Sequence, residues 1–267
     1  MSDDRPDCPD RPTDRPVPPA RSGAPWTWTI PPVSAEELPL VLHVAQRRLE
    51  VGTEVDLVVP VTAGHRVGAP ALDALLVGAG FRAVGRPPGD RDGVSVARVV
   101  RERTLADTVG AGMRLLVCGV NPSLYSADAG VGYARPGNRF WPAALAAGLV
   151  AADRDPVAAL ADGMGMTDFA KRATRTAAEV TRAEYDAGFA RVDALVRWLR
   201  PGAVCFVGLS GWRTVVDRHA VAGPQPDGVA GRPAYVMPST SGRNARTPLA
   251  ELAGHLAAAV ALGSPAV

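Results

Sequence analysis

The sequence predicts an α/β protein, with a three-layer α/β/α domain around a mostly parallel sheet at residues 105–267. From Leu105 onward, short apolar strands alternate with helical segments, the order that gives a parallel sheet covered on both faces. A small α/β block at 26–104 precedes this part. Residues 1–25 repeat Asp, Arg and Pro with almost no apolar residues, so they predict a disordered tail, because such a segment cannot offset its ordering entropy.

Within the small block, "ELPLVLHVAQRRLE" has apolar residues at helical spacing and "EVDLVVPVT" is an apolar strand. "PALDALLVGAGF" predicts a helix that ends at Gly78 or Gly80, and "FRAVGR" and "VSVARVVRER" predict two strands joined by the turn "PPGDRDG". This order resembles the C-terminal third of a class I methyltransferase, without the half that would bind the methyl donor. The resemblance implies a remnant without transfer activity, and a generic α/β appendage is the alternative.

In the regular part, "MRLLVCGV" predicts a strand, followed by a long loop and the helix "RFWPAALAAGL". "DPVAALADGMGMTDF" predicts a helix and a loop, and "TRAEYDAGFARVDALVRWLRPG" a helix with a Thr cap and a Pro-Gly stop. "AVCFVGLS" is a strand leading into "GWRTVVDRH", and "PAYVMPSTSGRNA" is a strand and loop before the helix "TPLAELAGHLAAAV". Ligands of such sheets bind at the carboxyl edge of the strands, where the loops after "LLVCGV" and "AYVMP" lie.

The composition excludes several classes of protein. No apolar run reaches the roughly 18 residues that span a bilayer, and the polar N-terminus does not resemble a signal peptide, so we expect a cytoplasmic protein with no membrane contact. Three scattered cysteines and four histidines show no disulfide or metal-ligand spacing, so neither a metal nor another cofactor is expected. Lys171 is the only lysine, and hence the only candidate for Schiff-base chemistry.

Two loops carry distinctive motifs. Gly119-Val120-Asn121-Pro122-Ser123 ends a strand, since proline has no N–H to continue the ladder, and Pro-Gly-Asn-Arg-Phe-Trp follows at 136–141. The second loop, "MPSTSGRNA", begins at Met237. Together they resemble, over about residues 105–262, the signature motifs of the mismatch-specific uracil/thymine DNA glycosylases. The glycines at 130 and 132 are a weak dinucleotide-binding pattern by comparison, because Pro122 removes a backbone donor that phosphate would need.

The resemblance implies a uracil-DNA-glycosylase-like fold and a base-excision repair enzyme. Such an enzyme flips uracil, or thymine, from a mismatch with guanine in double-stranded DNA and hydrolyses its glycosidic bond, leaving an abasic site. Asn121 would orient the attacking water, and Tyr133 would stack on the flipped base. The implied base pocket comprises Val120, Ser123, Ser126, Tyr133, Asp168 and Ser239, with backbone groups near Val120 and Ser126 reading the base. The implied wedge and reader of the opposite base are Gly242, Arg243 and Asn244, and the implied contacts to the DNA backbone are Arg139 and Ser241.

Two departures from the family pattern leave alternatives open. Ser123 replaces a glycine of the motif and would tighten the pocket wall, so a mismatch-binding protein with weak catalysis is an alternative function. Asp168 would either tune the water or the base, or only cap a helix. The single lysine favours a monofunctional glycosylase over a strand-cutting lyase. A further alternative gives the small block a partner-docking role, in which case deleting residues 1–104 would leave activity intact.

Overall fold

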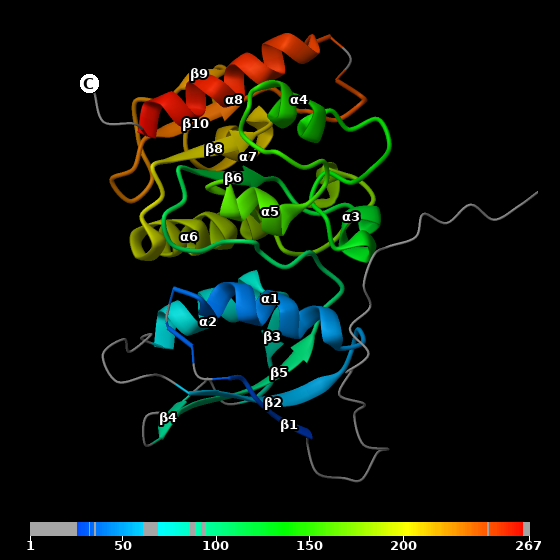
Figure 1. Ribbon diagram of the computed structural model, residues 1–267, viewed down its shortest axis with the longest axis vertical. Coiled ribbons are helices and arrows are strands. Elements are labelled where there is room, and N and C mark those ends of the chain that lie inside the picture. Colours follow the sequence, from blue (N-terminus) through cyan, green and yellow to red (C-terminus); the bar gives the residue numbers. More distant parts are fainter. Residues whose placement is uncertain are drawn as a thin grey trace, which may run out of the picture.

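The computed structural model describes residues 26–31, 33–34, 36–60, 69–85, 89–91, 94–244 and 246–263. The predicted disordered tail at 1–25 lies outside these residues. Two five-stranded sheets form the framework of the described chain (Figure 1). The α/β class, the mostly parallel sheet of the larger part and the preceding small α/β block are confirmed. None of the described helices has the length and apolar character needed to cross a membrane.

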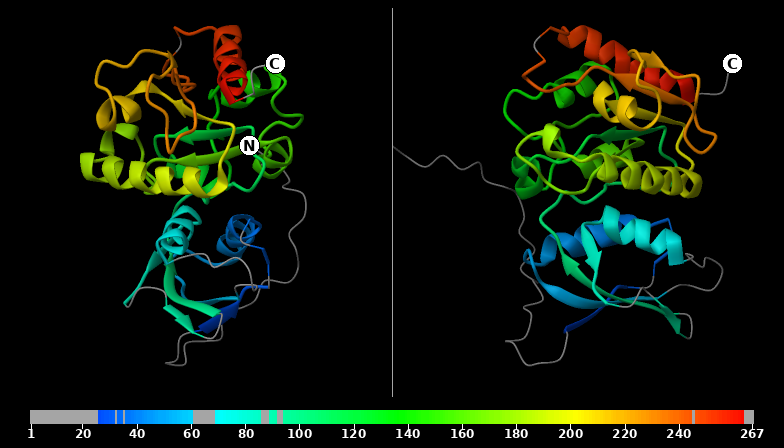
Figure 2. Two further views of the ribbon diagram at one scale, coloured as in Figure 1. Left: turned by 90° about the vertical axis from the view of Figure 1, so that its left-hand side faces the viewer. Right: turned by 180° about the vertical axis from the view of Figure 1, so that it is seen from behind.

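The first sheet belongs to the small block and has the order β1-β2-β5-β3, with β4 also pairing with β5. β1 and β2 are parallel, while β5 runs antiparallel to its neighbours. The strands are β1 (Trp26–Thr29), β2 (Glu54–Pro60), β3 (Phe81–Ala83), β4 (Gly89–Arg91) and β5 (Val94–Arg101). Helices α1 (Leu38–Arg48) and α2 (Ala69–Gly78) lie on the face of this sheet that is turned toward the second sheet (Figures 1 and 2).

The second sheet has the order β7-β6-β8-β10-β9, and only β9 is antiparallel to its neighbour. Its strands are β6 (Leu115–Gly119), β7 (Met164–Asp168), β8 (Ala203–Val207), β9 (Gly223–Pro224) and β10 (Ala234–Met237). β6 is fully buried, and its successive side chains point to opposite faces. Leu115 and Val117 belong to one apolar core cluster, and Leu116 and Cys118 to the other.

Helices cover both faces of the second sheet. α4 (Phe140–Ala146) and α8 (Leu249–Gly263) pack on one face, and α6 (Arg182–Leu199) and α7 (Leu209–Val215) on the other (Figure 2). The short helices α3 (Leu124–Ala129) and α5 (Pro156–Ala161) and the 3₁₀ turn Ala177–Glu179 belong to the connections. A capping box fixes the start of α6, where Thr181 accepts from the backbone N–H of Glu184.

The structure corrects two sequence expectations in the larger part. Met164–Asp168, expected to be a loop, is strand β7, which pairs along its whole length with β6. In its sequence, MGMTD, only the β-branched Thr167 is typical of strands, and pairing with burial overrides this weak preference. The expected long loop after β6 contains helix α3, because Ser123 caps it by accepting from the N–H of Ser126.

A buried ionic cluster joins the small block to the larger part. The Asp107 carboxylate accepts from Lys171 Nζ and Arg191 Nη1, each at 2.6 Å, and from Thr167 Oγ1 at 2.8 Å. Its backbone faces the small block, where its N–H donates to the Gly78 carbonyl at 2.8 Å. One apolar core cluster also contains buried residues from both parts. The contact between them is therefore built like a protein interior.

Candidate active site

A cavity of about 480 Å³ lies where the four parallel strands of the second sheet end. Val120 follows β6, Asp168 and Val207 end β7 and β8, and Ser239 follows β10. A cavity of this size accommodates a small ring system such as a nucleobase. Ten of the residues selected from the sequence line it: Val120, Asn121, Ser123, Ser126, Tyr133, Asp168, Ser239, Ser241, Arg243 and Asn244. Gly242 and Arg139 lie in the loops around it.

The amide of Asn121 has a fixed orientation. Its Nδ2 donates to Thr174 Oγ1 at 2.7 Å, to the Arg172 carbonyl at 3.0 Å and to the Pro122 carbonyl at 3.2 Å. The Thr174 hydroxyl donates its own hydrogen bond to the Thr176 carbonyl at 2.7 Å, so toward Asn121 it can act only as an acceptor. The amide nitrogen must therefore face this cluster, which leaves Oδ1 as the polar atom available to a ligand.

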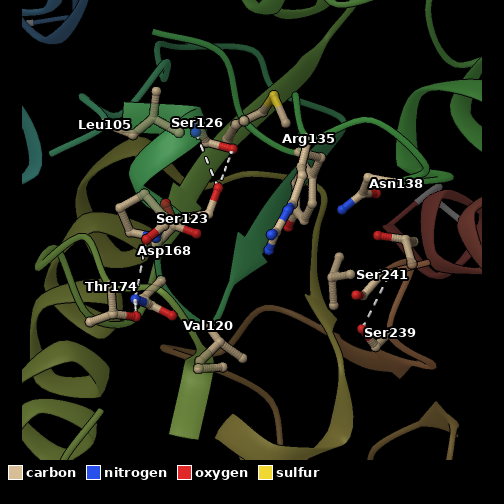
Figure 3. A pocket seen from close by; sticks show the side chains of 18 of the residues that line it. Leu105, Val120, Ser123, Ser126, Arg135, Asn138, Asp168, Thr174, Ser239 and Ser241 are labelled. Carbon is tan, nitrogen blue, oxygen red and sulfur yellow. Dashed lines mark hydrogen bonds between the residues drawn. The ribbon is translucent and has the colours of Figure 1, made fainter. Parts of the chain in front are cut away.

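The first loop is stiffened by its own serines. Ser123 Oγ accepts from the Ser126 N–H and donates to Ser126 Oγ, both at 3.1 Å (Figure 3). The Ser126 N–H is thus already bonded, and its carbonyl accepts from the N–H of Val131. The carbonyl of Val120 accepts from the N–H of Ala170. The hydroxyls of Ser123 and Ser126, more than these backbone groups, are the polar atoms that the loop offers to the cavity.

Tyr133 lies in an uncommon backbone conformation at the cavity wall. Its φ is 56°, which costs energy for a residue with a bulky side chain and suggests a functional constraint. One face of its ring stacks on Phe140 at a centroid distance of 4.2 Å and an interplanar angle of 19°. The hydroxyl is buried and has no partner among the described residues. Burial raises the pKa of this phenol well above its usual value.

Asp168 is the last residue of β7 and pairs with Gly119 of β6. Only 8% of the residue is exposed, and Figure 3 shows its carboxyl group among the cavity side chains, near Ser123. Asp168 ends β7, and the next helical element is the 3₁₀ turn Ala177–Glu179 with Thr176 as its cap, so the alternative that Asp168 caps a helix is wrong. Burial raises the pKa of its carboxyl to about 6, against the smaller opposing effect of Lys171.

The second loop is held against the first by backbone bonds and by Arg139. The Arg139 N–H donates to the Thr240 carbonyl at 2.9 Å, and its guanidinium donates to the carbonyls of Asn244 and Thr247. Arg139 therefore fastens this loop, and its bonded nitrogens are less available to DNA phosphate. Gly242 packs so closely on the first loop that an added Cβ would lie 2.9 Å from the Gly137 carbonyl oxygen.

Asn244 also serves the second loop itself. Its Nδ2 donates to the Ser239 carbonyl, and its N–H to the Ser241 carbonyl, both at 2.8 Å. Arg243, by contrast, is exposed at the cavity, and only its backbone N–H is bonded among the described residues, to Ser241 Oγ at 3.4 Å. Hydrogen bonds thus hold the backbone of the second loop, while the long cationic side chain of Arg243 extends from it at the cavity.

Several cavity residues were not selected from the sequence. Arg135 and Arg175 are exposed arginines, and Figure 3 shows Arg135 extending between the wall with Asp168 and the wall with Asn138 and Ser241. Arg135 directly precedes the Pro-Gly-Asn-Arg motif, a signal that could have identified it. Thr174, the main partner of Asn121, stands in a segment without a recognisable pattern, so only the structure reveals it.

The fold and the cavity define an α/β/α protein with a nucleobase-sized, asparagine-containing site at the carboxyl edge of its parallel sheet. Residues 106–258 match the sequence model of the uracil DNA glycosylase superfamily, and the chain belongs to this superfamily. Membership implies a DNA N-glycosylase, a base-excision repair hydrolase that binds DNA.

Among the described residues, no group of three or more His, Cys, Asp or Glu side chains is arranged to hold a metal ion.

Proposed function

We propose that this protein is a monofunctional DNA glycosylase that removes uracil, and more slowly thymine, from mismatches with guanine in double-stranded DNA. Its superfamily membership supports the reaction class. The observation that carries the catalytic assignment is the fixed amide of Asn121, whose Nδ2 has three acceptors within hydrogen-bond distance for its two hydrogens. The product would be an abasic site.

Asn121 would act on the water nucleophile. With Nδ2 held, Oδ1 can accept a hydrogen bond from a water molecule and orient it toward the anomeric carbon of the flipped nucleotide. The attack completes hydrolysis as the sugar reaches an oxocarbenium-like state. An amide is not a base at neutral pH, so the rate depends on how well the base leaves. The negative charge that develops on a departing uracil is spread over its ring by resonance, which explains the proposed preference for pyrimidines.

The proposed preference for mismatches follows from the cost of flipping and from the second loop. Unstacking a base costs a few kcal/mol, least when the base is mispaired. Arg243 would fill the vacated position, since its exposed guanidinium can stack on bases and contact phosphates. Arg135 and Arg175 would bind the backbone around the flipped nucleotide. Of the backbone groups proposed to read guanine, those of Asn244 are engaged within the protein, so Gly242 is the better candidate.

The position of Lys171 supports a monofunctional enzyme. Lyase activity needs an amine that forms a Schiff base with the sugar. The only lysine of the chain has a side chain that is 9% exposed and is paired with Asp107 at 2.6 Å. It does not line the cavity. Strand cleavage should therefore require alkali added after the reaction.

The test is single-turnover cleavage of a labelled duplex with one G·U pair, comparing wild type with Asn121→Ala and with the control Gln225→Ala, which removes an amide side chain outside the cavity. We expect alkali-dependent product from wild type and the control, a loss of at least about 100-fold in Asn121→Ala, and a rate order of G·U, then G·T, then A·U. Tight binding without product from wild type would instead indicate the alternative, a mismatch-binding protein.

A further inference from the structure

The Asp168 carboxyl group lies in a confined space that a glycine creates. A Cβ added to Gly119 would be 2.3 Å from Asp168 Oδ1 and 3.0 Å from the Tyr133 hydroxyl, so both polar groups converge on this point of the cavity wall. The Tyr133 hydroxyl is buried without a partner. The Asp168 carboxyl forms no hydrogen bond or salt bridge with the described residues, although its backbone carbonyl accepts from Arg191 at 2.6 Å. The Asp168 carboxyl, which lines the cavity, is therefore free to interact with a bound base.

The charges around Asp168 do not neutralise it. The titratable groups packed against it are Asp107, Cys118, Tyr133, Lys171 and Arg191, and the exposed Arg135 and Arg175 line the same cavity. The two packed cations, Lys171 and Arg191, are each bonded to Asp107 at 2.6 Å. An ionised carboxylate without a partner is costly in such a site, so burial shifts the equilibrium toward the neutral acid relative to an exposed aspartate. With a pKa of about 6, about half of the Asp168 carboxyl is protonated at pH 6 and about a tenth at pH 7. The acid form carries an O–H donor.

We infer that Asp168 is the general acid of the site, which gives its proton to the excised base as the glycosidic bond breaks. This inference rests on the proposed glycosylase function. The electron pair of the C1′–N bond goes to the base, which takes the proton from the carboxyl group and leaves neutral. Water then adds to C1′ and releases one proton, which restores the Asp168 acid directly or through solvent. Atoms and charges balance without any other reactant.

The direction of the pH dependence distinguishes a general acid from a general base at Asp168. A general acid works in its protonated form, so the rate should fall as pH rises above about 6, by up to about tenfold per unit. The ionised carboxylate would also repel the negative charge that develops on the departing base. If Asp168 instead activated water as a general base, the rate would rise over the same range.

The experiment measures single-turnover excision from pH 5 to 8.5 for wild type, Asp168→Asn and the exposed control Asp153→Asn. Two duplexes are used, one with uracil and one with 5-fluorouracil opposite guanine. The fluorine stabilises the departing anion, so it reduces the need for an acid. We expect a falling profile for wild type and the control, and a flat, lower profile for Asp168→Asn. The advantage of 5-fluorouracil over uracil should be at least about fivefold larger in Asp168→Asn than in wild type.

Each outcome is decisive. A flat or rising wild-type profile overturns the acid role even if Asp168→Asn fails to fold. An unchanged 5-fluorouracil advantage in folded Asp168→Asn also overturns it, because a structural role would slow both substrates equally. In both cases excision by wild type leaves the proposed function standing. If wild type releases neither base at any pH, the proposed function fails and this inference fails with it.

Discussion

Asp107→Asn should destabilise the whole protein strongly. The substitution keeps the shape of the side chain but removes the charge that compensates Lys171 and Arg191, whose side chains are 9% and 6% exposed. Each bonds to Asp107 at 2.6 Å, so two buried cations lose their common partner. Breaking a buried ion pair from one side typically costs about 3–5 kcal/mol. Since domains are stable by about 5–15 kcal/mol, the variant should be marginally folded.

Urea unfolding at pH 7, followed by tryptophan fluorescence and circular dichroism, measures this loss. Asp56→Asn is the control, because its bonds to Arg98 lie on the surface of the first sheet and such pairs contribute little. A loss for Asp107→Asn below about 1 kcal/mol, or no larger than that of the control, would refute the reasoning. If residues 26–104 and residues 105–267 of wild type unfolded in two separate urea transitions, the inference that one apolar core joins the two parts would be refuted.

The effect also has a defined pH dependence. Burial alone would raise the pKa of Asp107, but Arg191 and Lys171 outweigh it and hold the pKa below its ordinary value of 3.8. A carboxyl group whose pKa is lowered by folding stabilises the protein above its unfolded-state pKa, and this contribution is lost as pH falls through the folded-state pKa. The difference between wild type and Asp107→Asn should thus be constant near neutrality and shrink below about pH 4.

Three further substitutions test the site. Thr174→Val removes an acceptor of Asn121 Nδ2, so single-turnover rates should fall by about 10–100-fold while affinity for mismatched DNA, measured by gel shift, stays the same. Gly119→Ala places a methyl group 2.3 Å from Asp168 Oδ1, so excision should fall by at least about tenfold, whereas thermal unfolding shows a cost of about 1–3 kcal/mol. Tyr133→Phe removes a buried hydroxyl without a partner, so unfolding should show unchanged or slightly higher stability.

The sequence predicts an element well where hydrophobic pattern and local preference agree. β6, β8 and β10 are short apolar runs, and α6 has a Thr cap and helical spacing, so each was predicted near its observed position. β7 was missed because only Thr167 of its five residues favours a strand, and its stability comes from pairing with β6. β4 and β9 were missed because their three and two residues carry too little pattern, and β1 was missed because its four residues directly follow the Pro-rich N-terminal segment.

The same limit applies to the candidate site. Asn121, Tyr133 and Ser239 stand in motifs, so the resemblance selected them together. That Asp168 faces Gly119 depends on strand pairing, and that Thr174 holds Asn121 depends on a loop 53 residues away, which no local pattern encodes. The sequence also could not show which polar atoms of the two loops can bind a ligand, because hydrogen bonds within the loops already engage many of them.

Arg191 connects the small block to the chemistry of the site. Its Nη1 bonds to the carboxylate of Asp107, whose backbone is bonded to Gly78, and its Nη2 bonds to the Asp168 carbonyl and Thr167 Oγ1 at 2.6 and 2.9 Å. The end of β7 that presents the proposed acid is therefore fixed by the cluster that joins the two parts. This argues against the alternative in which deleting residues 1–104 leaves activity intact, because the deletion would uncover this cluster and the apolar core around it. We accordingly propose that residues 26–104 stabilise the fold of the glycosylase part at 105–267, whether or not they are a methyltransferase remnant.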